Sequence, residues 1–574
     1  MRWNLFNNVD KKIRFGWADL LVIFLLLSLL YLLTQLGSGM HAPFSPQQQT
    51  SLSLDPKWLP YYAGRSLLRM FIAFAASLIF TFIYGRIAAY NRTAEKIMIP
   101  AIDILQSVPV LGFLSATVLA FMALFPGSLL GVEFASIFAI FTGQVWNMTF
   151  SFYHSLTTIP RDLNEAAKMN RLNTWQRFGK LEVPFSMIGL VWNSMMSFGG
   201  GWFFLAASES ISVLNQNIHL PGIGSYMAQA ASEGNIRYII YSIVTMIVVI
   251  VVVDQLFWRP IIAWSQKFKN EQTEAKEVPT SWVYDILKRA RFVHWINQNI
   301  RKFFHDLLVY VSSKGSGIAL PKPMQRIRNI LKWLILILVA VFALRYVYAG
   351  ILEIARLSWG ELVHALILGL LTTLRVFVST LLAVLWTLPV GVYIGTNPRI
   401  ARIAQPVVQV LASFPANMVF PIVTVLYLKL GVSMEIGAVP LMMLGTQWYV
   451  LFNVIAGAMA IPSDLREAAA ILKLTRWQTW KTLIFPAVFP FLITGCITAS
   501  GGAWNASIVS EIVSWKTNNL QASGLGSYIA QATKLGNWPE IIWGIIVMCL
   551  LVVVINRLLW RRLYALAEKK YHLD

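Results

Sequence analysis

Two arginines lie inside long apolar segments at matched positions, Arg69 in SLLRMFIAF and Arg375 in TTLRVFVST. A cation in such a segment costs roughly 2.5–3.5 kcal/mol on membrane-insertion scales and is rarely kept without a partner or a function. Two interpretations stay open. Each arginine could snorkel to lipid headgroups or pair with a carboxylate such as Glu209 or Glu511. Alternatively, the two guanidinium groups could line a solute pathway and bind a planar oxyanion bidentately.

Other chemistry has little support in the residue types. The seven histidines are scattered without ligand spacing, and no paired carboxylates or nucleophile–base arrangement appears. The only cysteines, Cys496 and Cys549, lie in apolar runs, which favours packing roles over a disulfide or a metal site. No GxxxxGK[ST] loop occurs, so ATP phosphates would have to be bound by another chain. The sequence therefore predicts a protein that is not an enzyme, with no cofactor or metal in this chain.

The composition is that of a membrane protein. Of the 574 residues, 57% are hydrophobic and 13% are charged, and the mean hydropathy is +0.61. The formal net charge of +21 could indicate nucleic-acid binding, but the lysines and arginines fall mostly between apolar runs, where the positive-inside rule accounts for them. We therefore expect contact with membrane lipid and none with nucleic acid.

Apolar runs long enough to cross a membrane recur in the same order in both halves. Because each half contains an even number of runs, the halves are parallel rather than inverted repeats. We predict an all-α integral membrane protein with about 12 transmembrane helices, as two parallel six-helix repeats. The predicted spans are 18–36, 64–86, 98–125, 133–157, 184–207 and 236–258, then 331–349, 361–390, 403–428, 434–458, 484–508 and 541–560.

Three regions follow from this pattern: a first six-span domain at 1–266, a basic linker at 267–330 and a second six-span domain at 331–574. The linker contains DILKRARFVHWINQNIRKFFHDLLVYV, in which apolar residues alternate with cations at roughly helical spacing. This spacing predicts an amphipathic helix, which could lie on the inner leaflet or pack on a cytoplasmic partner. The cation distribution also predicts that both termini and the linker are cytoplasmic.

One stretch occurs twice between the apolar runs, as IPRDLNEAAKMNRLNTWQRFGKLEVP at 159–184 and IPSDLREAAAILKLTRWQTWKTLIFP at 461–486. In each copy a proline opens the stretch, an acid follows in the first turn, and an alanine pair favours helix with a small-residue face. A polar helical hairpin with tryptophan anchors is suited to docking a partner. The residues predicted to carry this contact are Glu165, Ala166, Ala167 and Trp175 in the first copy and Glu467, Ala468, Ala469 and Trp477 in the second.

A second matched region follows the repeated stretch, GGGWFFLAASES from Gly199 and GGAWNASIVSEI from Gly501. It aligns two tryptophans, Trp202 and Trp504, which could be interfacial anchors or part of a gate. It also aligns Glu209 with Glu511 at the predicted outer ends of the fifth spans, where a carboxylate would be solvated or paired. The glycines could serve close packing or form a moving wall of a pathway.

The next matched pieces, GIGSYMAQA from Gly222 and GLGSYIAQA from Gly524, predict a re-entrant turn and a short helix that closes an outer gate. A plain surface loop is the other interpretation of these glycine-rich pieces. In either case they follow a span rather than a soluble strand, so a phosphate-binding loop is excluded.

The repeated stretch resembles the coupling loop of ABC importer permeases, in which EAA is followed nineteen residues after the glutamate by a proline. The family usually has glycine six residues after the glutamate, whereas this chain has Arg171 and Lys473. Asn170 or Asn173 could supply the left-handed residue of the turn in the first copy. Together with TLxR, SxP, GxW…E and GLGSY, the stretch resembles the permease branch that serves nitrate, sulfonate, taurine and bicarbonate importers.

The resemblance implies a permease subunit of an ATP-driven importer in a bacterial inner membrane. Its partners would be two ABC ATPase subunits, which carry ATP and Mg, and a periplasmic substrate-binding protein. The EAA loops would be cytoplasmic, and the cargo would be a small oxyanion. The main alternative is an ion-gradient-driven twelve-span secondary transporter, although the GxxxDRxGRR-like loop expected after its second span is absent. A membrane scaffold would not need the matched Arg, Glu and Gly positions.

Overall fold

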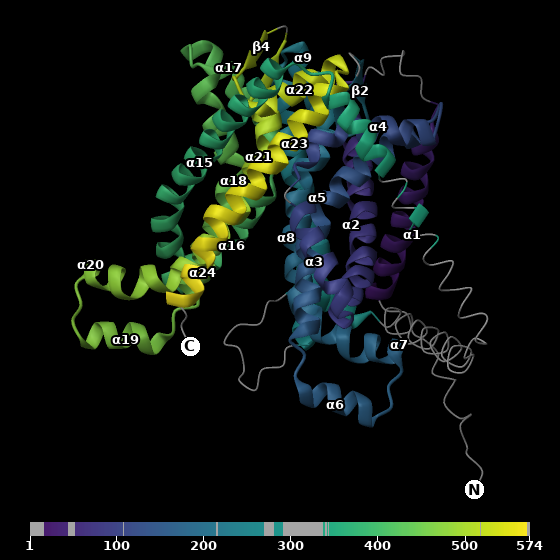
Figure 1. Ribbon diagram of the computed structural model, residues 1–574. Helices are drawn as coiled ribbons and strands as arrows, with labels where there is room; N and C mark the ends of the chain where they lie inside the picture. Colours follow the sequence, from purple (N-terminus) through teal and green to yellow (C-terminus); the bar gives the residue numbers. More distant parts are fainter. Residues whose placement is uncertain are drawn as a thin grey trace, which may run out of the picture. The chain divides into compact units, whose positions relative to one another are not determined.

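The computed structural model describes residues 17–43, 52–268 except 107 and 214–215, 281–290 and 344–570 except 517, with four further residues between 334 and 341. These residues are almost entirely helical, with two short two-stranded sheets (Figure 1). The chain forms two compact units that do not follow the sequence repeat. Unit 1 comprises Met1–Gly39, Ser151–Met195 and Val251–Leu338, and unit 2 comprises Met40–Phe150, Met196–Ile250 and Val339–Asp574.

The first half of the chain folds as a series of helices with one β-hairpin. Its elements are α1 (Trp17–Ser38), α2 (Leu59–Tyr90), α3 (Arg92–Leu105), α4 (Val110–Leu124), α5 (Leu130–Thr157), α6 (Arg161–Met169), α7 (Thr174–Arg177), α8 (Val183–Glu209), β1 (Ser210–Val213), β2 (Gln216–His219), α9 (Ile223–Glu233), α10 (Ile236–Val253) and α11 (Arg259–Ser265), followed by α12 (Trp282–Arg289).

The second half repeats this order from its second span onward. Its elements are α15 (Trp359–Thr396), α16 (Pro398–Ser413), α17 (Phe420–Leu430), α18 (Met434–Met459), α19 (Ser463–Ile471), α20 (Arg476–Thr479), α21 (Phe485–Ser510), β3 (Ile512–Trp515), β4 (Asn518–Gln521), α22 (Leu525–Leu535), α23 (Trp538–Ile555) and α24 (Arg561–Lys570). The repeat seen in the sequence is therefore also a repeat of helices and hairpins.

Six helical segments of the described residues are long and apolar enough to cross a membrane. These are Pro56–Tyr90, Ile236–Phe268, Trp359–Thr396, Met434–Met459, Arg476–Ser510 and Trp538–Ala567. The long helices α1, α5 and α8 coincide with three more of the predicted spans. The predicted span at 331–349 and the predicted amphipathic helix of the linker lie largely outside the described residues.

The prediction of a single third span in each half is wrong. Residues 98–125 divide into α3 and α4, with Pro109 extended at the start of α4. Residues 403–428 divide in the same way at Pro415, which precedes a short 3-10 turn and α17. The helices α3 and α16 end at Leu105 and Ser413, a few residues before these prolines. Proline lacks an N–H and disfavours helix in the residue before it, so the next helical segment starts only after the proline. With 11 residues, α17 rises only about 16 Å, roughly half of a bilayer core.

Short π-helical segments occupy matched positions in the two halves. One pair, Phe178–Glu182 and Trp480–Ile484, joins the repeated stretch to α8 and α21 without a break. The other pair, Asp254–Trp258 and Asn556–Trp560, follows α10 and α23. The segment Asp254–Trp258 connects α10 to α11, and the helical segment continues as far as Phe268. The sixth span therefore extends beyond residue 258, where it was predicted to end.

Within unit 2, the second half packs α15, α18 and α21 side by side (Figure 1). The hairpin of α19 and α20 lies at one end of these helices, and β4 and α22 lie at the other end. The largest apolar cluster of this unit contains residues from both halves, including Val118 of α4 and Trp504 of α21. Each β-hairpin is antiparallel and connects its long helix to the short helix that carries the GxGSY motif.

Candidate functional site

The first repeated stretch forms a helical hairpin in unit 1. The α6 helix exposes Glu165 and Ala166 and buries Ala167, because the small face of the alanine pair turns partly inward. At the end of α6 the Leu172 N–H donates to the Ala167 carbonyl at 3.1 Å. The Arg177 guanidinium then ties α7 back to α6 by donating to Asn164 Oδ1 at 2.9 Å.

The second stretch repeats this arrangement in unit 2. The α19 helix exposes Glu467 and Ala468 and buries Ala469. At its end the Leu474 N–H donates to the Ala469 carbonyl at 3.1 Å. The two EAA triplets therefore have the same pattern of exposure, and both glutamates are accessible to a partner.

The turn inside each hairpin uses a cationic residue where the family pattern has glycine. Arg171 has φ +49° and Lys473 has φ +48°. The prediction that Asn170 or Asn173 supplies the left-handed residue is wrong, since these residues have φ −76° and −71°. The paired bonds that close a Schellman motif hold the residue after the helix end in the left-handed region whatever its side chain.

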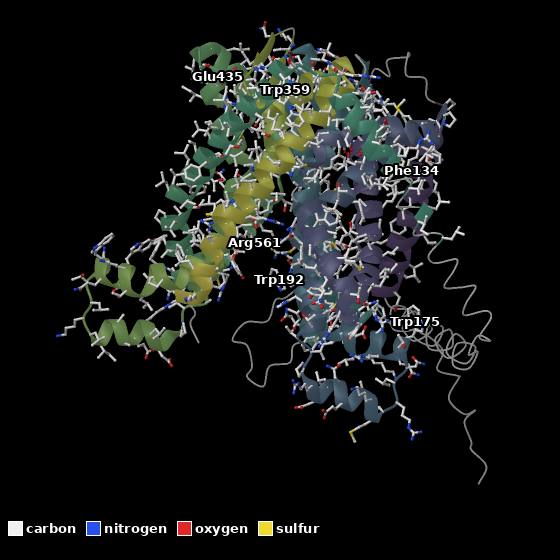
Figure 2. The ribbon with its side chains drawn as sticks, viewed as in Figure 1. Phe134, Trp175, Trp192, Trp359, Glu435 and Arg561 are labelled. Atoms are coloured by element: carbon white, nitrogen blue, oxygen red, sulfur yellow. The ribbon has the colours of Figure 1, made fainter. Side chains whose placement is uncertain are left out.

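The second short helix of each hairpin begins with a capping box. In α7, Asn173 Oδ1 accepts from the Gln176 N–H at 2.8 Å and Gln176 Oε1 accepts from the Asn173 N–H at 3.1 Å. A threonine and a glutamine form the same box at α20. These caps fix the helices that carry Trp175, which is 50% exposed, and Trp477, which is 71% exposed. Figure 2 shows Trp175 on α7.

The two hairpins differ in how much apolar surface they expose beside these tryptophans. The first hairpin exposes Met169. The second exposes two aliphatic residues at the end of α19, Ile471 and Leu472. Both surfaces combine apolar anchors with exposed carboxylates and cations, a composition typical of protein-docking surfaces.

A buried cluster of charges, the first charge cluster, lies at the C-terminal end of α8 in unit 2. It is formed by Arg65, Arg69, Glu133 and Glu209. The Arg69 guanidinium donates from Nη2 to Glu133 Oε1 at 2.8 Å and from Nη1 to Glu209 Oε1 at 2.7 Å. Arg65 donates to Glu133 as well. All four side chains are at most 1% exposed, so two cations and two carboxylates neutralise each other away from solvent.

The second charge cluster, at the end of α21, contains Arg375, Glu435 and Glu511. Arg375 Nη1 donates to Glu511 Oε1 at 3.0 Å, and Nη2 pairs with Glu435. Here one cation faces two carboxylates. The Glu435 side chain is 46% exposed, whereas that of Glu511 is fully buried. Figure 2 shows Glu435 at the end of unit 2 opposite the α19–α20 hairpin.

In both clusters a glutamate caps the N-terminus of a short helix. Glu209 Oε2 accepts from the Gly224 N–H at 2.7 Å in α9. Glu511 Oε2 accepts from the Gly526 N–H at 2.8 Å in α22. Carboxylates are stabilised at this end of a helix by the N–H groups that lack intrahelical partners.

This cap explains the glycines of the GxGSY motifs. A Cβ at Gly222 would overlap the Glu209 carboxylate, and a Cβ at Gly524 would overlap that of Glu511. The short helix that these motifs predict is confirmed in both halves. Glycine is therefore required for the close approach of the carboxylate, not for a phosphate.

The structure brings together Arg69 with Glu209 and Arg375 with Glu511, as the pairing interpretation expected. The idea that these glutamates are solvated is wrong, because both are fully buried. Trp202 and Trp504 are 1% exposed and pack inside the protein, so the interfacial-anchor interpretation is also wrong. Within unit 2, the hairpin of α19 and α20 precedes α21, and Glu511 follows the end of α21.

Sequence reasoning missed Arg65, Glu133 and Glu435. The two glutamates occupy matched positions near the starts of α5 and α18, four and two residues into apolar helices. That match was a usable signal, since an acid at a repeated site in an apolar run needs a partner. Among the residues that the structure describes, no group of His, Cys, Asp and Glu side chains could hold a metal ion.

Curated relatives resemble the chain at moderate identity. A nitrate import permease protein of Leptolyngbya laminosa is 27% identical over 32% of this chain and 62% of its own length. A bicarbonate transport system permease protein of Synechococcus elongatus is 24% identical over 29% of this chain and 57% of its length. The taurine transport system permease protein of Escherichia coli is 23% identical over 33% of this chain and 66% of its length. The chain thus spans less than two thirds of each relative.

The model of one protein family matches the chain twice, over residues 65–257 and 387–572. Each match contains one hairpin, the long helix that follows it and the glutamates of one charge cluster, and the first match also contains Arg65 and Arg69. The two matches together cover more than half of the sequence. The chain therefore belongs to the family of binding-protein-dependent transport system inner membrane components, and it carries the family's domain twice.

Proposed function

We propose that this protein is the permease subunit of an ATP-driven ABC importer and supplies both transmembrane domains in one chain. The observation that carries the proposal is the pair of exposed hairpins, which share the EAA exposure, the left-handed cation and the capping box. One ATPase subunit would bind at Glu165 to Lys180 and another at Glu467 to Lys481. ATP and Mg would be bound by these partners.

The long helices supply a mechanism for coupling. Each hairpin continues through a π segment into α8 or α21, which ends at Glu209 or one residue before Glu511. A helix of 27 residues such as α8 is about 40 Å long. Movement of a hairpin would therefore displace the glutamate that caps α9 or α22, and the short helix with it. Closure of the ATPase pair on binding ATP would open the pathway toward the outside of the membrane.

The orientation of the protein follows from its charges. The hairpins and the linker are basic, so we place them, with both termini, in the cytoplasm of a bacterial cell and the protein in its inner membrane. The charge clusters would then lie toward the periplasm, where a substrate-binding protein would deliver the solute. Residues 1–266 and 331–574 would form the two domains, joined by the linker at 267–330.

Single-cysteine labelling of intact cells tests this orientation. Gly222–Tyr226 is largely buried, so it is a poor labelling site. Exposed Ser232 in α9 and Lys534 in α22 are better sites. We expect Ser232→Cys and Lys534→Cys to react with an impermeant maleimide, and Trp175→Cys to react only after lysis. Reaction at position 175 alone in intact cells would reverse the orientation and exclude ATPase docking.

The cargo that we propose is a small oxyanion such as nitrate, bicarbonate or a sulfonate such as taurine. This choice rests on the names of the relatives, which include importers of all three. The charge clusters themselves do not supply an anion site in this structure, since the guanidinium groups of Arg69 and Arg375 are bonded to carboxylates.

The main test replaces Glu165 and Glu467 together by arginine. Both side chains are exposed, so the protein should fold normally while ATPase binding and ATP-dependent uptake are lost. Glu233→Arg, a reversal at an exposed carboxylate of α9, is the control. Unchanged ATPase binding and uptake in the double variant would contradict the proposal. Uptake that follows an ion gradient without ATP would instead support a secondary transporter.

A further inference from the structure

Midway along α8, one face of the helix meets polar groups of the second half. Gly199, Gly200 and Phe203 lie on this face by helical spacing. A Cβ at Gly199 would lie 2.8 Å from Ser413 Oγ, and one at Gly200 would lie 3.1 Å from Tyr449 Oη. Asn417 Nδ2 donates to the Phe203 carbonyl at 3.5 Å. All of these residues belong to unit 2.

Hydrogen-bonding capacity is left unused at this place. Asn417 is 8% exposed, and its Oδ1 atom is buried without a hydrogen-bond partner. The hydroxyl of the half-buried Tyr449 has no hydrogen-bond partner within the described part of the chain, whereas the buried Tyr427 hydroxyl has one. A buried polar group without a partner is unfavourable, so its retention requires an explanation such as a ligand or water.

The facing helix leaves room beside these groups. In α21, a Cβ at Gly501 would meet nothing within 4 Å, and a Cβ at Gly502 would lie 3.6 Å from the Tyr449 ring. The Tyr449 ring therefore lies between the glycines of α8 and those of α21. In both helices these glycines begin at the seventeenth residue, Gly199 in α8 and Gly501 in α21.

We propose that Ser413, Asn417 and Tyr449 form a hydrogen-bonding site for a small oxyanion within the transport pathway. The site rests on the proposed function, because it supplies the solute site that an importer needs between its two halves. It differs from the arginine site that the sequence suggested. The Ser413 and Tyr449 hydroxyls can donate hydrogen bonds to the oxygens of the anion without carrying a charge. The unpartnered Asn417 Oδ1 atom accepts instead, so it fits a donor on the solute, such as the hydroxyl of bicarbonate or the ammonium group of taurine.

Neutral donors suit a site through which a solute only passes. Binding must be favourable enough for the solute to enter and weak enough for it to leave. A guanidinium pair would hold an oxyanion more tightly than hydroxyl and amide groups do. None of the three residues is acidic, so no carboxylate of the site would repel an anion.

The test uses the full chain, its ATPase and its binding protein in proteoliposomes. Uptake of nitrate, bicarbonate and taurine is measured separately, and the solute that the wild type carries serves as the probe. We expect Tyr449→Phe, which removes one oxygen, to lower uptake at limiting solute about tenfold, since a hydrogen bond to a charged group is lost. Asn417→Ala should lower it similarly. ATP hydrolysis without solute should not change.

Tyr427→Phe is the matched control, because its hydroxyl already donates to the Gly437 carbonyl at 3.0 Å in the same half. Its uptake per folded protein should equal that of the wild type. Normal uptake in both Tyr449→Phe and Ser413→Ala, at wild-type elution volume in size exclusion, would overturn the site and leave the proposed function standing. Absence of ATP-dependent uptake in the wild type would overturn both.

Discussion

The two charge clusters occupy equivalent places in the repeat but have different surroundings. In the first cluster, two arginines balance two buried glutamates. In the second, Leu371 stands at the position that matches Arg65, and Arg375 alone faces Glu435 and Glu511. What both keep is the arginine, the helix-capping glutamate and the glycine that admits it. The shared residues therefore form the helix cap. The residues that differ set how deeply the second glutamate of each cluster, Glu133 or Glu435, is buried.

Solvation explains why the second cluster tolerates its unequal charge. A buried carboxylate without a full partner costs several kcal/mol, whereas a half-exposed one keeps part of its hydration. Glu435 is half-exposed and also accepts from the Ser523 N–H at 2.8 Å. The second half thus keeps water access at the place where the first half is sealed.

The largest expected effect is a difference in stability between variants of Glu133 and Glu435. Glu133→Gln leaves two buried guanidinium groups short of a charge partner and should lower the free energy of unfolding by about 3–5 kcal/mol. The matched variant Glu435→Gln should cost about 1 kcal/mol, because its pair is partly solvated. Denaturation by SDS in mixed micelles measures both. Equal losses would show that the difference in burial has no energetic meaning.

Glycine substitutions test the feature that the clusters share. Gly222→Ala and Gly524→Ala should each cost about 1–3 kcal/mol, because the new methyl group overlaps the capping carboxylate. Gly501→Ala is the control, since open space surrounds its Cβ and alanine favours helix by up to about 1 kcal/mol. Thermal unfolding in detergent compares the three. A loss at Gly501 as large as that at Gly524 would contradict the cap.

The turns of the hairpins should respond alike in both halves. Arg171→Gly and Lys473→Gly remove a side chain from a left-handed residue and should each stabilise the protein by about 1 kcal/mol. Both side chains are exposed, so few contacts are lost. The shift of the unfolding midpoint of each variant checks this. Destabilisation of either one would mean that the cation makes a contact that outweighs its strain.

The smallest effect is a pH dependence of stability confined to the β-hairpin of β1 and β2. Burial lowers the pKa of His219, whose matched residue in β4 is Gln521. Because the unfolded histidine has the higher pKa, it binds a proton first as the pH falls. This contribution to stability is complete above about pH 6.5, and it declines as the pH drops below that value. His219→Gln should flatten the stability profile from pH 7 to 5, and an unchanged profile would exclude His219 as its source.

Some of this architecture could be predicted from the sequence and some could not. The hairpins were visible because both copies keep EAA, tryptophan and proline at the same spacing. The cost of an isolated charge in an apolar helix made a carboxylate partner such as Glu209 one of the interpretations of Arg69, beside snorkelling and an anion site, and the sequence could not choose among them. The break at Pro109 was missed because hydropathy does not register a missing N–H group. The left-handed Arg171 was missed because the bonds at the helix end override the preference of the side chain.

If both hairpins dock a partner, one chain binds two ATPase subunits, one at each hairpin. Native mass spectrometry of the tagged chain, purified from its own membrane with its ATPase, measures this directly. We expect two ATPase subunits per chain in the wild type, one in Glu165→Arg or Glu467→Arg alone, and none in the double variant. A single ATPase per wild-type chain, or two that persist in the double variant, would contradict this expectation.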